Sequence, residues 1–186
     1  MRTKGVERPY RQSGHLGPNA LVGASWETCA TPIGDMLVVV DDLGVREIDL
    51  PGCFVPPKSD GAPGSGHQFL GAAVAQLTEY FAGKRRDFDL PLVPEGTAFQ
   101  LEVWWALADI AYGDTESYGS VAARVGRPKA QRAVGMANRA NPLPIVLPCH
   151  RVIGSGGRLV GYGGGLAMKQ WLLEHERGVL AATALA

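Results

Sequence analysis

The segment from Pro144 to Arg151, Pro-Ile-Val-Leu-Pro-Cys-His-Arg, restricts the fold of this 186-residue chain more than any other. Three apolar residues between two prolines are typical of an extended, strand-like run, and we expect one here. Pro148 has a fixed φ and disfavours a helical conformation at Leu147, which reinforces that geometry. The run therefore delivers Cys149 at a constrained corner, next to an imidazole and a guanidinium.

Cys149 is a candidate nucleophile. Most free cysteines are buried packing residues, and this is the alternative interpretation. A cysteine attacks as its thiolate, and nearby cationic groups lower its pKa from about 8.5. His150 and Arg151 supply such groups, whereas a packing residue has no need of this corner. We therefore interpret Cys149 as a prepared nucleophile.

The charge of the chain is strongly two-sided, although the net charge is zero. Residues 1–116 hold 9 Lys+Arg and 16 Asp+Glu, and residues 117–186 hold 9 and 2, so the two parts carry −7 and +7. Between Ser117 and Arg151 the acidic residues are absent and the basic ones are Arg124, Arg127, Lys129, Arg132, Arg139 and Arg151. A solvated basic face is one explanation. Because the cysteine corner lies in the same segment, we expect a nucleic-acid backbone as the partner.

Residues 24–94 have the pattern of a small α/β domain. The apolar runs Met36–Val40 and Val45–Leu50 flank an Asp-Asp-Leu-Gly turn and predict a β-hairpin. Phe88–Leu92 could add a further strand. Residues 1–23 mix Arg, Gly, Pro and Ser without periodicity, and we expect a disordered tail there.

Two longer helices are predicted from capping-box patterns. Ser65 with Gln68, and Thr97 with Gln100, each precede apolar residues at helical spacing. The first helix is expected to stop at Gly83 and to pack on the sheet.

Residues 95–180 are predicted to form a second, mainly α domain. Two short helical segments, Ser117–Val125 and Lys129–Arg139, are separated by Gly-Arg-Pro at 126–128, which predicts a helix-turn-helix. A glycine-rich stretch leads into a last helix from about Leu166 to Arg177.

These pieces together resemble the O6-alkylguanine-DNA alkyltransferases, also called methylated-DNA-protein-cysteine methyltransferases. The matching pieces are Ser117-Tyr118-Gly119, Arg132-Ala133-Val134-Gly135, Asn141-Pro142, Pro148 to Arg151, Gly161-Tyr162 with Gly163 to Gly165, and Trp171-Leu172-Leu173 running to Glu176. Weaker matches extend upstream through Phe99-Gln100 to Thr31–Gly34. The resemblance implies a ribonuclease-H-like N-terminal α/β domain, a small sheet with a helix, and a winged-helix-like C-terminal helix-turn-helix domain.

The resemblance also implies a reaction. An alkyl group on guanine O6, and on thymine O4, would pass irreversibly to Cys149, so that each molecule acts once. Cys149 would lose its proton through a water to His150, which Glu176 orients. A solvated terminal glutamate is the alternative for Glu176, because Glu is mostly exposed. Asn141, between the recognition helix and the active-site segment, can satisfy backbone groups of both.

Because O6 of a stacked guanine is inaccessible, the base must be flipped out of the duplex. By resemblance, the helix-turn-helix does this from the minor groove, with Arg132 inserted in place of the base. A phosphate contact is the alternative role for Arg132. Tyr118 would crowd the adjacent phosphate and hydrogen-bond the base, and Arg124, Lys129 and Arg139 would contact phosphates.

The base pocket is expected to be lined by Tyr118, Pro144, Val152, Tyr162, Gly163 and Gly164. Glycines let backbone groups approach a ligand closely. Many relatives carry a serine at the position of Gly163, so that any hydroxyl contact there is lost in this chain.

Three other functions fit parts of the pattern. A non-catalytic lesion binder would keep the helix-turn-helix but lack the nucleophile, and Cys149 argues against it. A helix-turn-helix transcription regulator would normally need a dimer surface, of which the sequence shows no sign. A cysteine hydrolase would turn over esters and would not need the basic segment.

The expected partner is double-stranded DNA carrying O6-alkylguanine, with no membrane and no obligate protein partner. We expect a cytoplasmic monomer, which could cluster on DNA, because there is no membrane-length apolar run or signal peptide. The cysteines at 29, 53 and 149 are odd in number and lack CxxC spacing. We therefore expect neither metal nor cofactor, and interpret Cys29 and Cys53 as packing residues.

Overall fold

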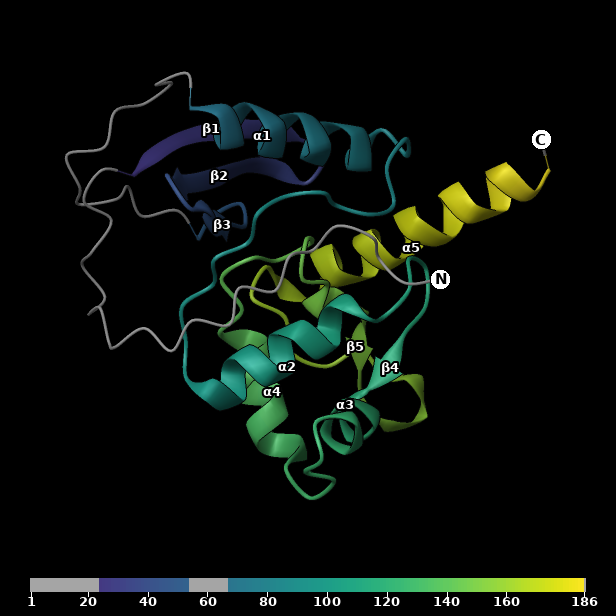
Figure 1. The fold of residues 1–186 in the computed structure, drawn as a ribbon. Helices are drawn as coiled ribbons and strands as arrows, with labels where there is room; N and C mark the ends of the chain where they lie inside the picture. Colours follow the sequence, from purple (N-terminus) through teal and green to yellow (C-terminus); the bar gives the residue numbers. More distant parts are fainter. Residues whose placement is uncertain (1–23, 54–66, 186) are drawn as a thin grey trace. The chain divides into compact units, whose positions relative to one another are not determined.

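The computed structural model describes residues 24–53 and 67–185. The chain separates into two compact units, with the division between Pro94 and Glu95 (Figure 1). The tail expected at residues 1–23 lies outside the described residues. No described helix is both long and apolar enough to cross a membrane.

The first unit contains an antiparallel sheet in the order β1 (Ser25–Thr31), β2 (Gly34–Asp41) and β3 (Gly44–Asp49). The hairpin between β2 and β3 matches the predicted one, whereas β1 was not expected. Its turn is held by Asp41, whose Oδ1 accepts hydrogen bonds from the backbone N–H of Leu43 at 2.8 Å and of Gly44 at 3.1 Å. Residues 36–40 of β2 are all buried, so the central strand has no polar face.

Helix α1 (Gln68–Phe81) contacts all three strands. Its N-cap is His67, whose ring nitrogen accepts from the N–H of Phe69 at 3.4 Å, so the predicted cap at Ser65 is wrong. The strand predicted at Phe88–Leu92 is also absent, because only Leu92 forms an isolated parallel bridge, to Val45.

The second unit is helical, as predicted. Helix α2 (Ala98–Ala108) begins with the predicted capping box, in which Thr97 and Gln100 bond each other's backbone N–H. Helices α3 (Tyr118–Arg124) and α4 (Gln131–Arg139) form the helix-turn-helix. They are joined through a short parallel pair, β4 (Glu116–Ser117) with β5 (Val152–Ile153), to the active-site segment. Helix α5 (Gly165–Ala184) is longer than predicted.

Candidate active site

The segment after α4 is a closed turn, so the predicted extended run from Pro144 is wrong. The side chain of Asn141 closes this turn: its Nδ2 donates to the carbonyl of Leu147 at 2.7 Å, and its Oδ1 accepts from the N–H of Leu143 at 3.0 Å. The N–H of Leu147 donates to the carbonyl of Leu143 at 2.8 Å, and Ile145 adopts a φ of 74°. These bonds outweigh the extended preference before proline, since they satisfy backbone groups that are buried here.

Cys149 begins the short 3-10 helix η1 (Cys149–Arg151) and is 4% exposed. Burial raises the pKa of its thiol to about 11, although a hydrogen bond from Asn141 and the charge of Lys169 oppose this. The backbone N–H of His150 lowers the pKa of Cys149, but burial outweighs it, so the expected net lowering by the charged side chains of His150 and Arg151 is wrong for this conformation. Both side chains engage Glu176 instead.

Glu176, on α5, is fully buried and accepts hydrogen bonds from three groups. His150 Nε2 lies 2.8 Å from its Oε1, Arg151 donates through Nε and Nη2 at 2.8–3.2 Å, and the N–H of Gly113 donates at 2.8 Å. Burial alone would raise the pKa of Glu176, but the hydrogen bonds and charges of His150 and Arg151 hold it well below its usual range. The solvated alternative for Glu176 is excluded.

His150 is set up as a proton acceptor. The carboxylate of Glu176 can only accept a hydrogen bond, so Nε2 of His150 carries the hydrogen that is shared with it. Nδ1 of His150 therefore has a free lone pair. Nδ1 is buried and has no hydrogen-bond partner in the part of the chain that the structure describes. Burial, together with the charges of Arg151 and Lys169, lowers the pKa of His150 more than Glu176 raises it, so the imidazole is neutral near pH 7.

Lys169 is a site residue that sequence reasoning missed. It is fully buried on α5, and its Nζ donates to the carbonyls of Val152 at 2.6 Å, Val160 at 2.9 Å and Gly161 at 3.4 Å. Burial lowers its pKa, and the charge of the Cys149 thiolate raises it. The spacing of Lys169, Leu172, Leu173 and Glu176 on one helical face was a usable signal, since it placed two charged residues at core positions.

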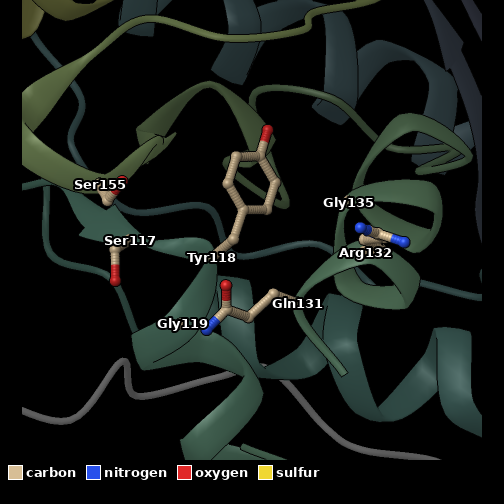
Figure 2. A pocket seen from close by; sticks show the side chains of 7 residues that line it. All are labelled: Ser117, Tyr118, Gly119, Gln131, Arg132, Gly135 and Ser155. Atoms are coloured by element: carbon tan, nitrogen blue, oxygen red, sulfur yellow. The ribbon is translucent and has the colours of Figure 1, made fainter. Parts of the chain in front are cut away.

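A groove of about 340 Å³ lies beside this network. It is lined by Ser117, Tyr118, Gly119, Gln131, Arg132, Gly135 and Ser155. Figure 2 shows the ring of Tyr118 pointing into the space between Ser155 and the helix that carries Arg132. Burial and the Cys149 charge raise the pKa of Tyr118, so its hydroxyl is protonated and can donate.

The basic residues do not all face solvent. Lys129, Arg132 and Arg139 are exposed. Arg124 is paired with Glu116 and also donates to the Ala106 carbonyl at 2.9 Å. Arg127 is paired with Glu102 at 2.7 Å and lies over the ring of Phe99. Arg151 is buried against Glu176, so its place in the expected phosphate-binding segment is wrong.

Comparison with known proteins identifies the family. Residues 25–94 match the family described as 6-O-methylguanine DNA methyltransferase, ribonuclease-like domain, and residues 98–178 match its DNA binding domain. The chain belongs to the 6-O-methylguanine DNA methyltransferase family. The two-domain fold class and the family resemblance predicted from the sequence are confirmed.

Relatives match this family member over nearly their full length. The methylated-DNA--protein-cysteine methyltransferase of Methanosarcina acetivorans is 45% identical over 149 residues, 78% of this chain and 94% of the relative. The methyltransferase of Methanosarcina mazei is 52% identical over 159 residues, which cover 81% of this chain and 95% of the relative. The crystal structure of Mycobacterium tuberculosis OGT in complex with DNA is similar with a TM-score of 0.77 and 41% identity, covering 83% of this chain and 94% of that one.

The other residues that the sequence predicts for the base pocket of this methyltransferase family member differ in exposure. Pro144 and Val152 are buried, Tyr162 and Gly164 are half-buried, and Gly163 is exposed. Lys169 donates hydrogen bonds both to the carbonyl of Val152, at the start of β5, and to that of Gly161 in the glycine-rich segment. Cys149 is buried and does not line the groove of about 340 Å³.

The other two cysteines lie in the first unit. Cys29 is buried, as a packing residue should be, but Cys53 is exposed, so its interpretation as a packing residue is wrong. Within residues 24–53 and 67–185 there is no group of three His, Cys, Asp or Glu side chains that could hold a metal ion.

Proposed function

We propose that this protein repairs DNA by transferring an alkyl group from guanine O6 to Cys149, irreversibly and once per molecule. The observation that carries this proposal is the buried pair of neutral His150 and Glu176 directly after buried Cys149, in which His150 Nδ1 is an acceptor without a protein partner among the described residues. Thymine O4 carries the same kind of alkyl group, and we include it as a substrate.

The transfer balances without a cofactor. The Cys149 proton passes, through a water, to His150 Nδ1, and the carboxylate of Glu176 stabilises the imidazolium. The sulfur then forms a bond to the alkyl carbon while the bond from that carbon to O6 breaks. The electron pair stays on the base, which takes up a proton at N1 and becomes ordinary guanine. A thioether does not reverse under physiological conditions, so the protein is consumed.

Proton transfer to His150 also explains how a thiol with a raised pKa can react. Burial penalises the free thiolate at Cys149, so that little of it forms in this conformation. If the proton moves to His150 only during the reaction, the resting protein does not have to carry a buried thiolate. Lys169, whose charge lowers the pKa of Cys149, stabilises the sulfur while it carries negative charge.

We propose that the helix-turn-helix holds the duplex from the minor groove and flips the damaged base. Lys129 and Arg139 contact phosphates, and Arg132, on the exposed side of α4, takes the place of the flipped base. The DNA complex of the similar Mycobacterium tuberculosis protein supports DNA as the partner. Arg124 contributes less, since Glu116 already neutralises it.

We further propose that the protein works as a cytoplasmic monomer without an obligate protein partner. A reactive thiol needs a reducing compartment, and the described residues hold three free cysteines and no disulfide. The proposed domains are residues 24–94, the small α/β unit, and residues 95–180, which hold every proposed site residue.

The test is mass spectrometry after mixing the protein with a duplex that contains one O6-methylguanine. We expect a gain of one methyl group per protein, located by peptide mapping on Cys149, and no second turnover. Methyl transfer to Cys29 or Cys53 would contradict the site. Hydrolysis of esters with many turnovers would favour a cysteine hydrolase, and binding of the lesion without any mass change would favour a lesion binder.

A further inference from the structure

Asn138 is a buried polar residue of α4 to which the proposed chemistry gives no role. Its side chain is 5% exposed. Nδ2 donates to the backbone carbonyl of Cys149 at 3.2 Å. Because a carbonyl oxygen only accepts, this bond determines which end of the amide is the nitrogen.

The other end of this amide is left without a donor. Asn138 Oδ1 is buried and has no hydrogen-bond partner within the described residues. A buried acceptor that is left unsatisfied costs about 1–3 kcal/mol, and most such groups in native proteins have a partner. The arrangement is therefore typical of a site that receives a donor from a ligand.

Asn138 is on the same helix as Arg132 and Gly135, which line the groove, and it bonds the backbone of Cys149. The ring of Tyr118 packs against α4 at Gly135. A Cβ atom added at Gly135 would lie 3.8 Å from this ring. Gly135 and Asn138 are three residues apart and share a helical face. The side chain of Asn138 opposes the rise in the pKa of Tyr118, which agrees with this placement. The Asn138 amide thus bonds the backbone carbonyl of Cys149 and lies on the same face of α4 as Gly135, near which the Tyr118 ring packs.

We propose that Asn138 Oδ1 accepts a hydrogen bond from the 2-amino group of O6-alkylguanine. This inference rests on the proposed function. Alkylation at O6 removes the proton from guanine N1, so the 2-amino group is the remaining donor on the Watson–Crick edge of the damaged base. O4-alkylthymine has no N–H on that edge, so Asn138 favours damaged guanine over damaged thymine.

The experiment compares single-turnover methyl transfer from duplexes that contain O6-methylguanine or O6-methylhypoxanthine, which lacks the 2-amino group. For the wild type we expect the second lesion to react about five- to tenfold more slowly, as a hydrogen bond of ordinary strength predicts. In Asn138→Leu, of similar size, the two lesions should react at rates within twofold of each other. Tyr118→Phe is the matched control: it removes a neighbouring hydroxyl but keeps the acceptor, so the ratio should stay near the wild-type value.

Each outcome decides the matter. Equal rates of the wild type on both lesions would overturn the inference, even if Asn138→Leu does not fold. An unchanged ratio in Asn138→Leu, with both rates lowered, would also overturn it and would make Asn138 a support of the Cys149 carbonyl alone. Absence of transfer from O6-methylguanine in the wild type would instead contradict the proposed function.

Discussion

At the scale of single residues, Glu176 decides what the two side chains after Cys149 do. In an extended run His150 and Arg151 would point apart, one to each side. In η1 both hydrogen-bond the same buried carboxylate. That arrangement removes a cation from the DNA-binding segment and gives His150 a fixed tautomer.

We expect Glu176→Gln to lower the rate of methyl transfer by about 100-fold, because the imidazolium loses its counter-charge. Since buried Arg151 also loses its partner, the free energy of unfolding should fall by about 3–5 kcal/mol. Single-turnover kinetics and denaturant unfolding measure the two effects. Glu174→Gln, an exposed glutamate on the same helix, is the control and should change neither.

Arg132 is exposed and lines the groove beside Tyr118, where a flipped base would pass. We expect Arg132→Ala to slow transfer from duplex O6-methylguanine by at least tenfold and to leave the reaction with free O6-benzylguanine within about twofold, because a free base needs no flipping. Rates measured on both substrates test this. Equal losses would show that Arg132 supports the pocket instead.

At the scale of elements, α4 divides its residues between two faces. Arg132 and Arg139 are exposed, whereas Val134, Ala137 and Asn138 are buried against the rest of the unit. Trp104 of α2 anchors this inner face by donating from Nε1 to the Ala137 carbonyl at 2.7 Å. The helix that we propose binds DNA therefore also bonds the backbone of Cys149, through Asn138.

We expect DNA affinity to fall with salt with a log-log slope of roughly −2 to −3, since Lys129, Arg132 and Arg139, which make no ion pair among the described residues, each displace about 0.9 counterion. Lys129→Gln and Arg139→Gln should each reduce the slope by about one unit. Arg124→Gln is the matched comparison, and its effect should be smaller because Glu116 pairs with Arg124. Binding titrations over a range of salt concentrations measure the three slopes. An equal effect of all three substitutions would show that the ion pair between Arg124 and Glu116 opens on DNA.

At the scale of the whole molecule, buried titratable groups limit stability at both ends of the pH range. Glu176 has a lowered pKa, and its contribution is lost as the pH falls below about 4.5. His150 also has a lowered pKa, so the unfolded chain binds its proton first and stability declines as the pH falls below about 6.5. Cys149 lowers the free energy of unfolding at alkaline pH, because its thiol ionises at a lower pH in the unfolded chain than in the folded one.

We expect the wild type to lose about 2 kcal/mol of unfolding free energy through Cys149 between pH 8.5 and 10.5, since the pKa of about 11 in the fold lies above the ordinary value of 9.0. Cys149→Ser should lack this loss, and so should the methylated protein, because neither has a thiol. Denaturant unfolding at several pH values measures the difference. Parallel pH profiles for the wild type and Cys149→Ser would contradict the closed, protonated thiol.

The amino-acid sequence alone predicted the class of fold, the helix-turn-helix and the candidate residues Cys149, His150 and Glu176, of which the structure joins His150 and Glu176. Capping boxes, glycine stops and helical periodicity are local signals, and they were correct for α2 at Thr97 and for the helices on either side of residues 126–128. Only the tertiary structure decided the conformation after α4, where Asn141 closes a turn that local preferences predict to be extended. It also decided which charges meet. Lys169, Arg151 and Asn138 acquire their roles from burial beside groups distant in sequence, and burial is a property of the packed molecule that no local pattern around those residues contains.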